Sequence, residues 1–294
     1  MTDARQPIVS VPFSRLCAAI SRFGEFMNNS FTLALTLGQE SPKPRRFIAT
    51  AAAAVALLSA AVAPAQAEPV KNIVLVHGAF ADGSGWQRVA AILGKDGYTV
   101  SVVQEPLTSL ADDVAATRRV LDLQQGPTLL VGHSYGGVVI TEAGNAPNVV
   151  GLVYIAAFIP GQGESALGLL SQAPAANTDI RATKDDFLYL DPAAFPADFA
   201  ADVPPAHANF MAHSQAMLAK AGGGAPVTAA AWHQKKSWAL VATRDHNINP
   251  DLERRMAKRA GSETIEVPAS HAAYISKPNE VARLIERAAK ASAQ

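Results

Sequence analysis

The sequence is poor in cysteine and in charged residues. Cys17 is its only cysteine, and charged residues make up 17% of the 294 residues. A lone cysteine cannot form an intramolecular disulfide. The 25 basic residues match the 25 acidic ones, and no basic cluster stands out. Nucleic acid is therefore not an expected partner.

Apolar residues are abundant, at 49% of the chain. This share supports a sizeable core, and the length fits one α/β domain preceded by a leader. Short apolar runs alternate with helical patterns, which predicts an α/β fold with a mostly parallel, doubly wound sheet. The expected strands include residues 73–76, 99–103, 128–131 and 149–158, and the expected helices include residues 86–98, 110–125 and 136–145.

The first 67 residues have the features of a leader. Arg45 and Arg46 precede a run rich in Ala, Leu and Val, and Ala65-Gln66-Ala67 follows it. This pattern predicts a secretory signal cleaved before Glu68, and hence a periplasmic or secreted protein that has lost Cys17. The alternative is a permanent anchor, but the run is short and Ala-rich for a membrane span. Residues 68–294 then form the folded domain.

One serine sits in a crowded turn. In "TLLVGHSYGG" (Thr128 to Gly137), an apolar strand ends at Gly132, and a helical pattern begins two residues after Ser134. A strand, a sharp turn with small residues and a helix together form a nucleophile elbow, which presents a serine hydroxyl above the sheet. Ser134 is the candidate nucleophile.

An acid and a base follow later in the chain. Asp245 lies just after the apolar strand 239–242, and His271 lies just after the strand 263–267. Residues beyond the carboxyl ends of parallel strands meet at one edge of a sheet. We therefore expect Ser134, Asp245 and His271 to form a catalytic triad. Asp251 is the rival acid, but it follows Pro250 and is placed to open a helix.

The four segments "VLVHGAF", "VGHSYGG", "VATRDHNINP" and "SHAAYIS" resemble the α/β-hydrolase superfamily. They are most similar to its small esterase and hydroxynitrile lyase-like branch, and the resemblance spans residues 70–288. It implies an oxyanion hole formed by backbone N–H groups, from Ala79 or Phe80 and from Tyr135. His77, in the same loop, is expected to be structural.

Residues 160–234 differ in composition from the rest and lack the strand–helix alternation. We expect them to form a mostly helical cap inserted over Ser134, with residues 222–226 ("GGGAP") as a flexible joint. Most of the apolar side chains that we single out should pack the cap on the core, and a few should line a substrate pocket. They are Phe187, Tyr189, Phe195, Phe199, Phe210, Met211, Met217 and Trp232.

The resemblance implies a serine esterase that acts through an acyl-enzyme and needs no metal or organic cofactor. A small to medium, largely uncharged ester is the expected substrate. Lactones, thioesters and amides remain alternatives, as does a non-catalytic ligand-binding role, and the oligomeric state stays open. Ser134 argues against the relatives that use an Asp nucleophile. Ala272, where lyases of this branch have Lys, argues against cyanohydrin cleavage.

Overall fold

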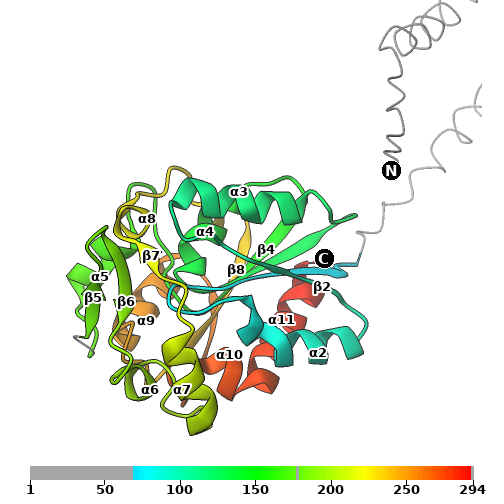
Figure 1. Ribbon diagram of the computed structural model, residues 1–294. Coiled ribbons are helices and arrows are strands. Elements are labelled where there is room, and N and C mark those ends of the chain that lie inside the picture. Colours follow the sequence, from blue (N-terminus) through cyan, green and yellow to red (C-terminus); the bar gives the residue numbers. More distant parts are fainter. Residues whose placement is uncertain (1–68, 177–178, 293–294) are drawn as a thin grey trace, which may run out of the picture. The chain divides into compact units, whose positions relative to one another are not determined.

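The computed structural model describes residues 69–176 and 179–292. Six parallel strands form the central sheet, in the order β2-β1-β3-β4-β8-β9 (Figure 1). Every residue of β1 and β3 is buried, as expected for central strands covered on both faces. The strands are β1 (Asn72–Val76), β2 (Thr99–Val103), β3 (Thr128–Ser134), β4 (Val149–Ala157), β8 (Lys236–Ala242) and β9 (Glu263–Val267).

Helices cover both faces of this sheet. α3 and α4 pack together over one face, and α2 and α11 pack together over the other (Figure 1). The expected doubly wound architecture is confirmed. The core helices are η2 (Gly83–Trp86), α2 (Gln87–Lys95), α3 (Leu110–Leu121), α4 (Gly136–Ala143), α9 (Pro250–Arg259), α10 (Ala273–Ser276) and α11 (Pro278–Ser292).

Local chemistry explains where these helices begin. The Ser109 hydroxyl accepts a hydrogen bond from the Asp112 N–H and caps α3, whose first turn contains Asp112 and Asp113. Asn249 caps α9 in the same way, through the N–H of Asp251. Asp251 therefore opens a helix, as its place after Pro250 predicts.

The segment between β4 and β8 is more mixed than we expected. It contains a three-stranded antiparallel sheet, in the order β5-β6-β7, as well as helices. These strands have two to four residues, too few for a recognisable alternation of apolar and polar residues. The elements are α5 (Ala166–Gln172), β5 (Ile180–Ala182), β6 (Phe187–Leu190), α6 (Phe195–Asp198), α7 (Pro205–His213), β7 (Leu218–Ala219), α8 (Lys220–Gly224) and η3 (Ala231–His233).

The expected flexible joint at residues 222–226 is instead partly helical. Gly222 to Gly224 lie within α8, and Gly222 and Gly223 are buried. The two ends of the insertion are instead joined to each other. The Gly163 N–H donates to the Val227 carbonyl at 2.8 Å, and the Val227 N–H donates to the Glu164 carbonyl at 2.9 Å.

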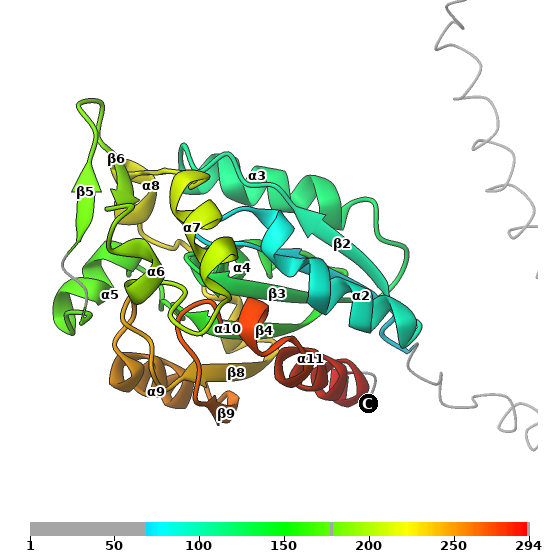
Figure 2. The same ribbon diagram turned by 60° about the horizontal axis from the view of Figure 1, so that its bottom comes forward.

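An ion pair fastens this base of the insertion to the core. The Arg259 guanidinium, in the last turn of α9, donates to both oxygens of the Glu164 carboxylate at 2.7 and 2.6 Å. A bidentate pair of this kind fixes orientation as well as distance. Elsewhere in the insertion, α7 packs against α6 and lies beside α10 (Figure 2).

The expected leader, residues 1–67, lies outside the described residues. Within residues 69–176 and 179–292, none of the helices has both the length and the apolar character needed to cross a membrane.

Candidate active site

Three side chains from distant parts of the sequence form a hydrogen-bonded chain. The Ser134 Oγ lies 2.8 Å from the His271 Nε2, and the His271 Nδ1 lies 2.6 Å from the Asp245 Oδ2. All three residues are buried. Ser134 ends β3, Asp245 follows β8 and His271 follows β9, so parallel strands deliver them to one edge of the sheet.

The turn at Ser134 is strained and tightly packed. Ser134 has φ 53°, a left-handed conformation that is unusual for a residue with a side chain. A Cβ atom on Gly132 would lie 2.5 Å from the Gly136 carbonyl oxygen, and one on Gly78 would lie 2.7 Å from the Ser134 Cβ. Glycine at these positions lets the chain turn sharply and lets the loop after β1 approach the serine.

Asp245 is well supplied with donors. Its Oδ1 accepts the N–H of Asn247 at 2.7 Å and the N–H of Ile248 at 2.9 Å, so its Oδ2 is left to accept from His271. These bonds stabilise the ionised carboxylate and fix its orientation. The rival Asp251 binds Arg254, and its side chain is 73% exposed. Asp251 therefore does not belong to this cluster.

Asp245 fixes which ring nitrogen of His271 faces Ser134. Because the Asp245 carboxylate can only accept, the His271 Nδ1 carries the proton, and its Nε2 is free to accept from the Ser134 hydroxyl. The neighbouring His133 donates from its Nε2 to the His271 carbonyl at 3.0 Å. Burial lowers the pKa of His133 well below its usual value, so it stays neutral. Sequence motifs did not reveal this contact, since 138 residues separate the pair.

The loop after β1 is held by a histidine. The His77 Nδ1 donates to the Gly78 carbonyl at 2.9 Å, and its Nε2 accepts the Glu105 N–H at 3.0 Å. Burial lowers the pKa of His77, which matches a neutral ring with one donor and one acceptor nitrogen. His77 thus has the structural position that its sequence context predicts.

The three candidate oxyanion-hole residues differ in their backbone contacts. The Phe80 N–H donates to the Ala216 carbonyl of the insertion at 2.9 Å, so it is already engaged. Of the two alternatives in this loop, Ala79 or Phe80, the Phe80 N–H is thus the one with a protein acceptor. Within the described ranges, the N–H groups of Ala79 and Tyr135 donate to no protein acceptor, and both residues line the pocket at Ser134.

Tyr135 is anchored through its ring. Its hydroxyl donates to the Asp113 Oδ2 at 3.0 Å, and the Asp113 Oδ1 accepts the Leu107 N–H at 2.8 Å. Burial raises the pKa of Asp113 to about 6. The nearby Glu105 carboxyl is also buried, and burial together with Asp113 raises its pKa well above the usual range. The position of Asp113 in the first turn of α3 does not by itself predict this contact.

An apolar pocket of about 50 Å³ opens at Ser134 and His271. No charged Asp, Glu, Lys or Arg is among its lining residues in the described part of the chain. The walls come from the loop after β1, the end of β4, the loop after β8 and the insertion. The apolar residues that line it are Ala79, Phe80, Phe158, Ala166, Leu167, Leu170, Ile180, Leu188, Leu218 and Ile248.

The insertion lines this pocket with aliphatic side chains. None of the aromatic and methionine residues that we singled out belongs to the lining. Phe195 and Phe199 are instead fully buried and stacked, with ring centroids 4.8 Å apart. The Phe199 ring meets the His271 imidazole edge-on, also at 4.8 Å.

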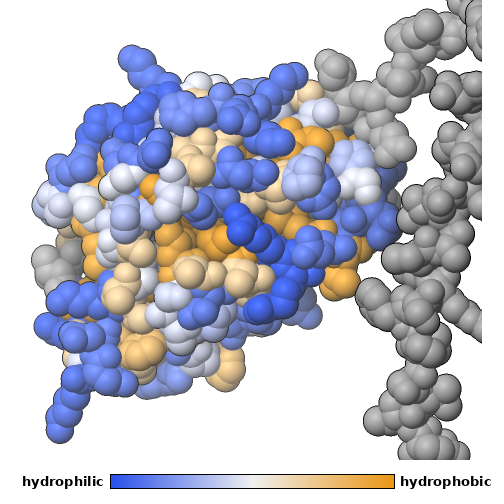
Figure 3. Space-filling view, turned by 90° about the horizontal axis from the view of Figure 1, so that it is seen from above, coloured by the Kyte–Doolittle hydropathy of each residue, from blue (hydrophilic) through white to orange (hydrophobic). Residues whose placement is uncertain are grey.

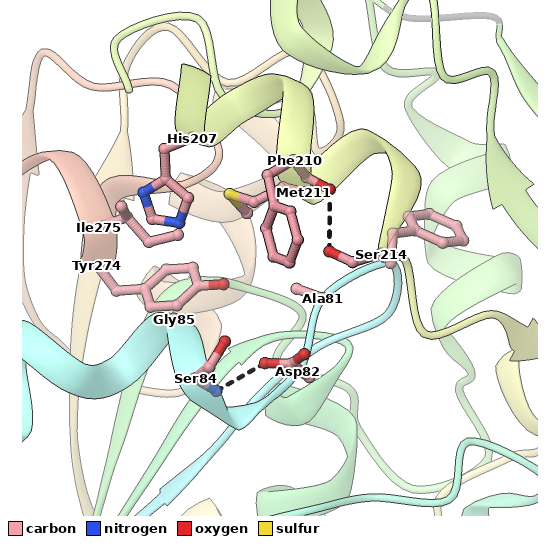
Figure 4. A pocket seen from close by; sticks show the side chains of 11 residues that line it. Ala81, Asp82, Ser84, Gly85, His207, Phe210, Met211, Ser214, Tyr274 and Ile275 are labelled. Atoms are coloured by element: carbon pink, nitrogen blue, oxygen red, sulfur yellow. Dashed lines mark hydrogen bonds between the residues drawn. The ribbon is translucent and has the colours of Figure 1, made fainter. Parts of the chain in front are cut away.

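Two other hollows lack the triad. Apolar surface bordered by hydrophilic residues is visible from above (Figure 3), and a groove of about 580 Å³ is lined by residues of α3 with Glu142 and the segment 225–228. A smaller cavity of about 30 Å³ lies where His207, Phe210 and Met211 face Tyr274 (Figure 4). Phe80 lines both this cavity and the pocket at Ser134. Chemistry, rather than volume, therefore identifies the candidate site.

Comparison with known proteins identifies the family of the chain. A family model described as "Alpha/beta hydrolase family" matches residues 73–284. The chain belongs to the alpha/beta hydrolase family. The match includes Ser134, Asp245 and His271.

Relatives within the alpha/beta hydrolase family include esterases. A carbendazim hydrolyzing esterase of Nocardioides is 35% identical over 116 residues, which cover 35% of this chain and 48% of that relative. This alignment thus spans about half of the relative's length. An alpha/beta hydrolase of Aspergillus novofumigatus is 26% identical over 244 residues, which cover 74% of this chain and 96% of that protein.

Solved structures share the fold. A pyrethroid hydrolase from Sphingobium faniae superposes with a TM-score of 0.66 at 22% identity, over 76% of this chain and 98% of that one. At this identity the likeness concerns the fold alone. The family match over residues 73–284 thus shows the family, and an esterase is among the relatives.

Proposed function

We propose that the protein is a serine esterase that hydrolyses small to medium, largely uncharged carboxylic esters. The observation that carries this proposal is the continuous chain of hydrogen bonds Ser134–His271–Asp245 beside an apolar pocket. The esterase relatives support it independently.

The first half of the reaction forms an acyl-enzyme. His271 takes the Ser134 proton at its Nε2 while the Ser134 Oγ attacks the ester carbonyl carbon. Asp245 stabilises the imidazolium that results. The oxyanion is positioned to accept from the N–H groups of Ala79 and Tyr135, and the loss of one such donor typically raises the barrier by about 3 kcal/mol. The imidazolium then donates its proton to the leaving alkoxide, and the C–O bond breaks.

The second half releases the acid. His271 takes a proton from a water molecule, whose oxygen attacks the acyl carbon, and the collapsing intermediate returns Ser134 to its resting state with the proton given back by His271. The scheme uses side chains and backbone of this chain throughout. Lactones, thioesters and amides react through the same steps, and the uncharged pocket does not distinguish among them.

The proposal is tested with a fluorophosphonate probe and with p-nitrophenyl esters of increasing acyl length. We expect covalent labelling of Ser134 and turnover that is highest for short to medium acyl chains. A protein that binds these esters without labelling or turnover would instead be a ligand-binding member of the family.

We also propose that the leader is removed before Glu68 and that the protein acts in the periplasm or the medium. The support is the order of twin arginines, apolar run and Ala65-Gln66-Ala67 in the sequence. N-terminal sequencing of the protein from each cell fraction tests this. Full-length protein found only in the inner membrane would show that the leader is an anchor.

A further inference from the structure

A second buried carboxyl lies behind the candidate triad. Glu253 belongs to the first turn of α9, and only 2% of its surface is exposed. Its carboxyl lies within hydrogen-bond range of the Asp245 carboxyl, and its Oε1 is buried and accepts from no donor in the described part of the chain. No step of the proposed reaction uses Glu253.

Two carboxylates cannot both be ionised in this place at little cost. Like charges in a buried site repel strongly, and one of the two groups must keep a proton unless a cation intervenes. The guanidinium of the adjacent Arg254 is engaged elsewhere, because it donates to Asp251 at 2.6 Å and to Glu266 at 2.7 and 2.9 Å on the exposed side of α9. We therefore expect this pair of carboxyls to hold a single negative charge.

The donors decide which of the two carries the proton. The Asp245 carboxylate accepts from two backbone N–H groups and from His271, at 2.6 to 2.9 Å. The Glu253 Oε2 accepts one long bond, from the Ala242 N–H at 3.4 Å, and its Oε1 has no donor in the described part of the chain. Ionised Asp245 is well stabilised and ionised Glu253 is not. Burial and the Asp245 charge raise the pKa of Glu253 well above its usual value, in agreement.

We propose that Glu253 is a positioning residue that stays protonated and donates a hydrogen bond to Asp245, and so holds the acid of the triad from behind. This inference rests on the proposed function. A neutral donor limits the negative charge behind His271 to that of Asp245. A second negative charge there would favour the protonated form of the neighbouring imidazole, whereas a neutral donor adds none.

Two variants separate this role from plain packing. Glu253→Gln keeps the size and an N–H donor but cannot ionise, whereas Glu253→Met fills similar space and donates nothing. For Glu253→Gln we expect kcat/KM within about twofold of wild type, with the acid limb of its pH profile unmoved. For Glu253→Met we expect kcat to fall about tenfold, as for one lost hydrogen bond to a charged group, and the acid limb to move to higher pH because Asp245 becomes more basic.

The matched control is Glu266→Gln. It removes an exposed carboxylate of β9 that binds Arg254, the neighbour of Glu253 in α9. It should therefore leave kcat and the pH profile unchanged. Thermal midpoints of all variants report on folding. Equal kcat and equal pH profiles for Glu253→Gln and Glu253→Met would overturn the proposal in favour of packing alone. An acid limb that moves to lower pH in Glu253→Gln would also overturn it, because it would mean that wild-type Glu253 is ionised.

A second measurement does not depend on turnover. The infrared difference spectrum between wild type and Glu253→Gln should contain the carbonyl stretch of a protonated carboxylic acid at pH 7, and the Glu266→Gln difference spectrum should not. If the protein hydrolyses no ester and this band is present, the proposed function fails but the protonated Glu253 stands. A carboxylate band in its place would overturn the proposal about Glu253.

Discussion

The backbone of Phe199 is hydrogen-bonded to the residue that follows His271. The Ala272 N–H donates to the Phe199 carbonyl at 2.9 Å, and the Phe199 ring lies edge-on to the His271 imidazole. Nearby, Asp202 accepts from the Ser270 hydroxyl at 2.5 Å and from the Ser270 N–H at 3.3 Å. The insertion therefore forms hydrogen bonds to the residue before His271 and to the residue after it. It also lines the pocket.

The hydrogen bonds between Asp202 and Ser270 predict that Asp202→Asn lowers activity, although Asp202 does not line the pocket. The amide offers one acceptor where the carboxylate offers two, so the Ser270–Ala272 loop loses support. We expect kcat to fall about tenfold, in line with the loss of one charge-assisted hydrogen bond, with KM little changed. Asp185→Asn, at an exposed position of the same insertion, is the control and should behave like wild type. Equal kcat for Asp202→Asn and wild type would contradict the role of this contact.

The acid of the triad is tested by a pair of variants. Asp245→Asn should fold but lose several powers of ten in kcat, about 10⁴-fold, because the amide favours the wrong imidazole tautomer. Asp251→Asn should cost under about 1 kcal/mol of stability and little activity, since its carboxylate lies exposed in the first turn of α9. Turnover at saturating ester and the thermal midpoint are measured for both. A crippled Asp251→Asn beside an active Asp245→Asn would mean that the triad has been assigned to the wrong acid.

Stability should fall in mild acid through His133. Its pKa is depressed in the folded protein by burial, so below about pH 6.5 the unfolded chain binds a proton that the folded protein does not. The contribution of His133 to the free energy of unfolding therefore has its full value above that pH and decreases as the pH falls below it. Buried carboxyls with raised pKa values, such as Asp113, act in the opposite direction. The comparison must therefore be made between variants.

His133→Gln isolates this effect, because the amide can still donate to the His271 carbonyl but does not titrate. Urea unfolding is measured at several pH values from 5 to 8 for wild type and variant. The difference in unfolding free energy between the two should shrink or reverse as the pH falls. A difference that stays constant across this range would show that His133 titrates normally in the folded protein.

The aliphatic pocket predicts a change in acyl-chain preference. Leu170→Ala removes part of the wall contributed by α5, so kcat/KM for longer p-nitrophenyl esters should rise relative to the acetate by about tenfold. Leu123→Ala is the matched control, since Leu123 is 75% exposed and does not line the pocket. Identical chain-length profiles for the two variants would place the acyl group elsewhere.

Local patterns and chain order were enough to predict the parallel sheet and to bring Ser134, Asp245 and His271 to one edge of it. Each of these residues follows an apolar strand, and parallel strands end together. Contacts between distant segments could not be predicted in this way. The bond from the Phe80 N–H to Ala216, the pairing of His133 with His271 and the place of Glu253 behind Asp245 all depend on packing. The strands β5 to β7 could not be predicted because they are too short to show an alternation of apolar and polar residues.

The nucleophile is the centre of this account, and Ser134→Ala tests it most directly. The variant lacks the only atom that the scheme uses to attack the ester carbonyl, while alanine fits the same space. We expect its turnover of p-nitrophenyl acetate to fall at least about 10³-fold, with the circular dichroism spectrum and thermal midpoint of the folded protein retained. Folded Ser134→Ala that hydrolyses p-nitrophenyl acetate at the wild-type rate would contradict the account.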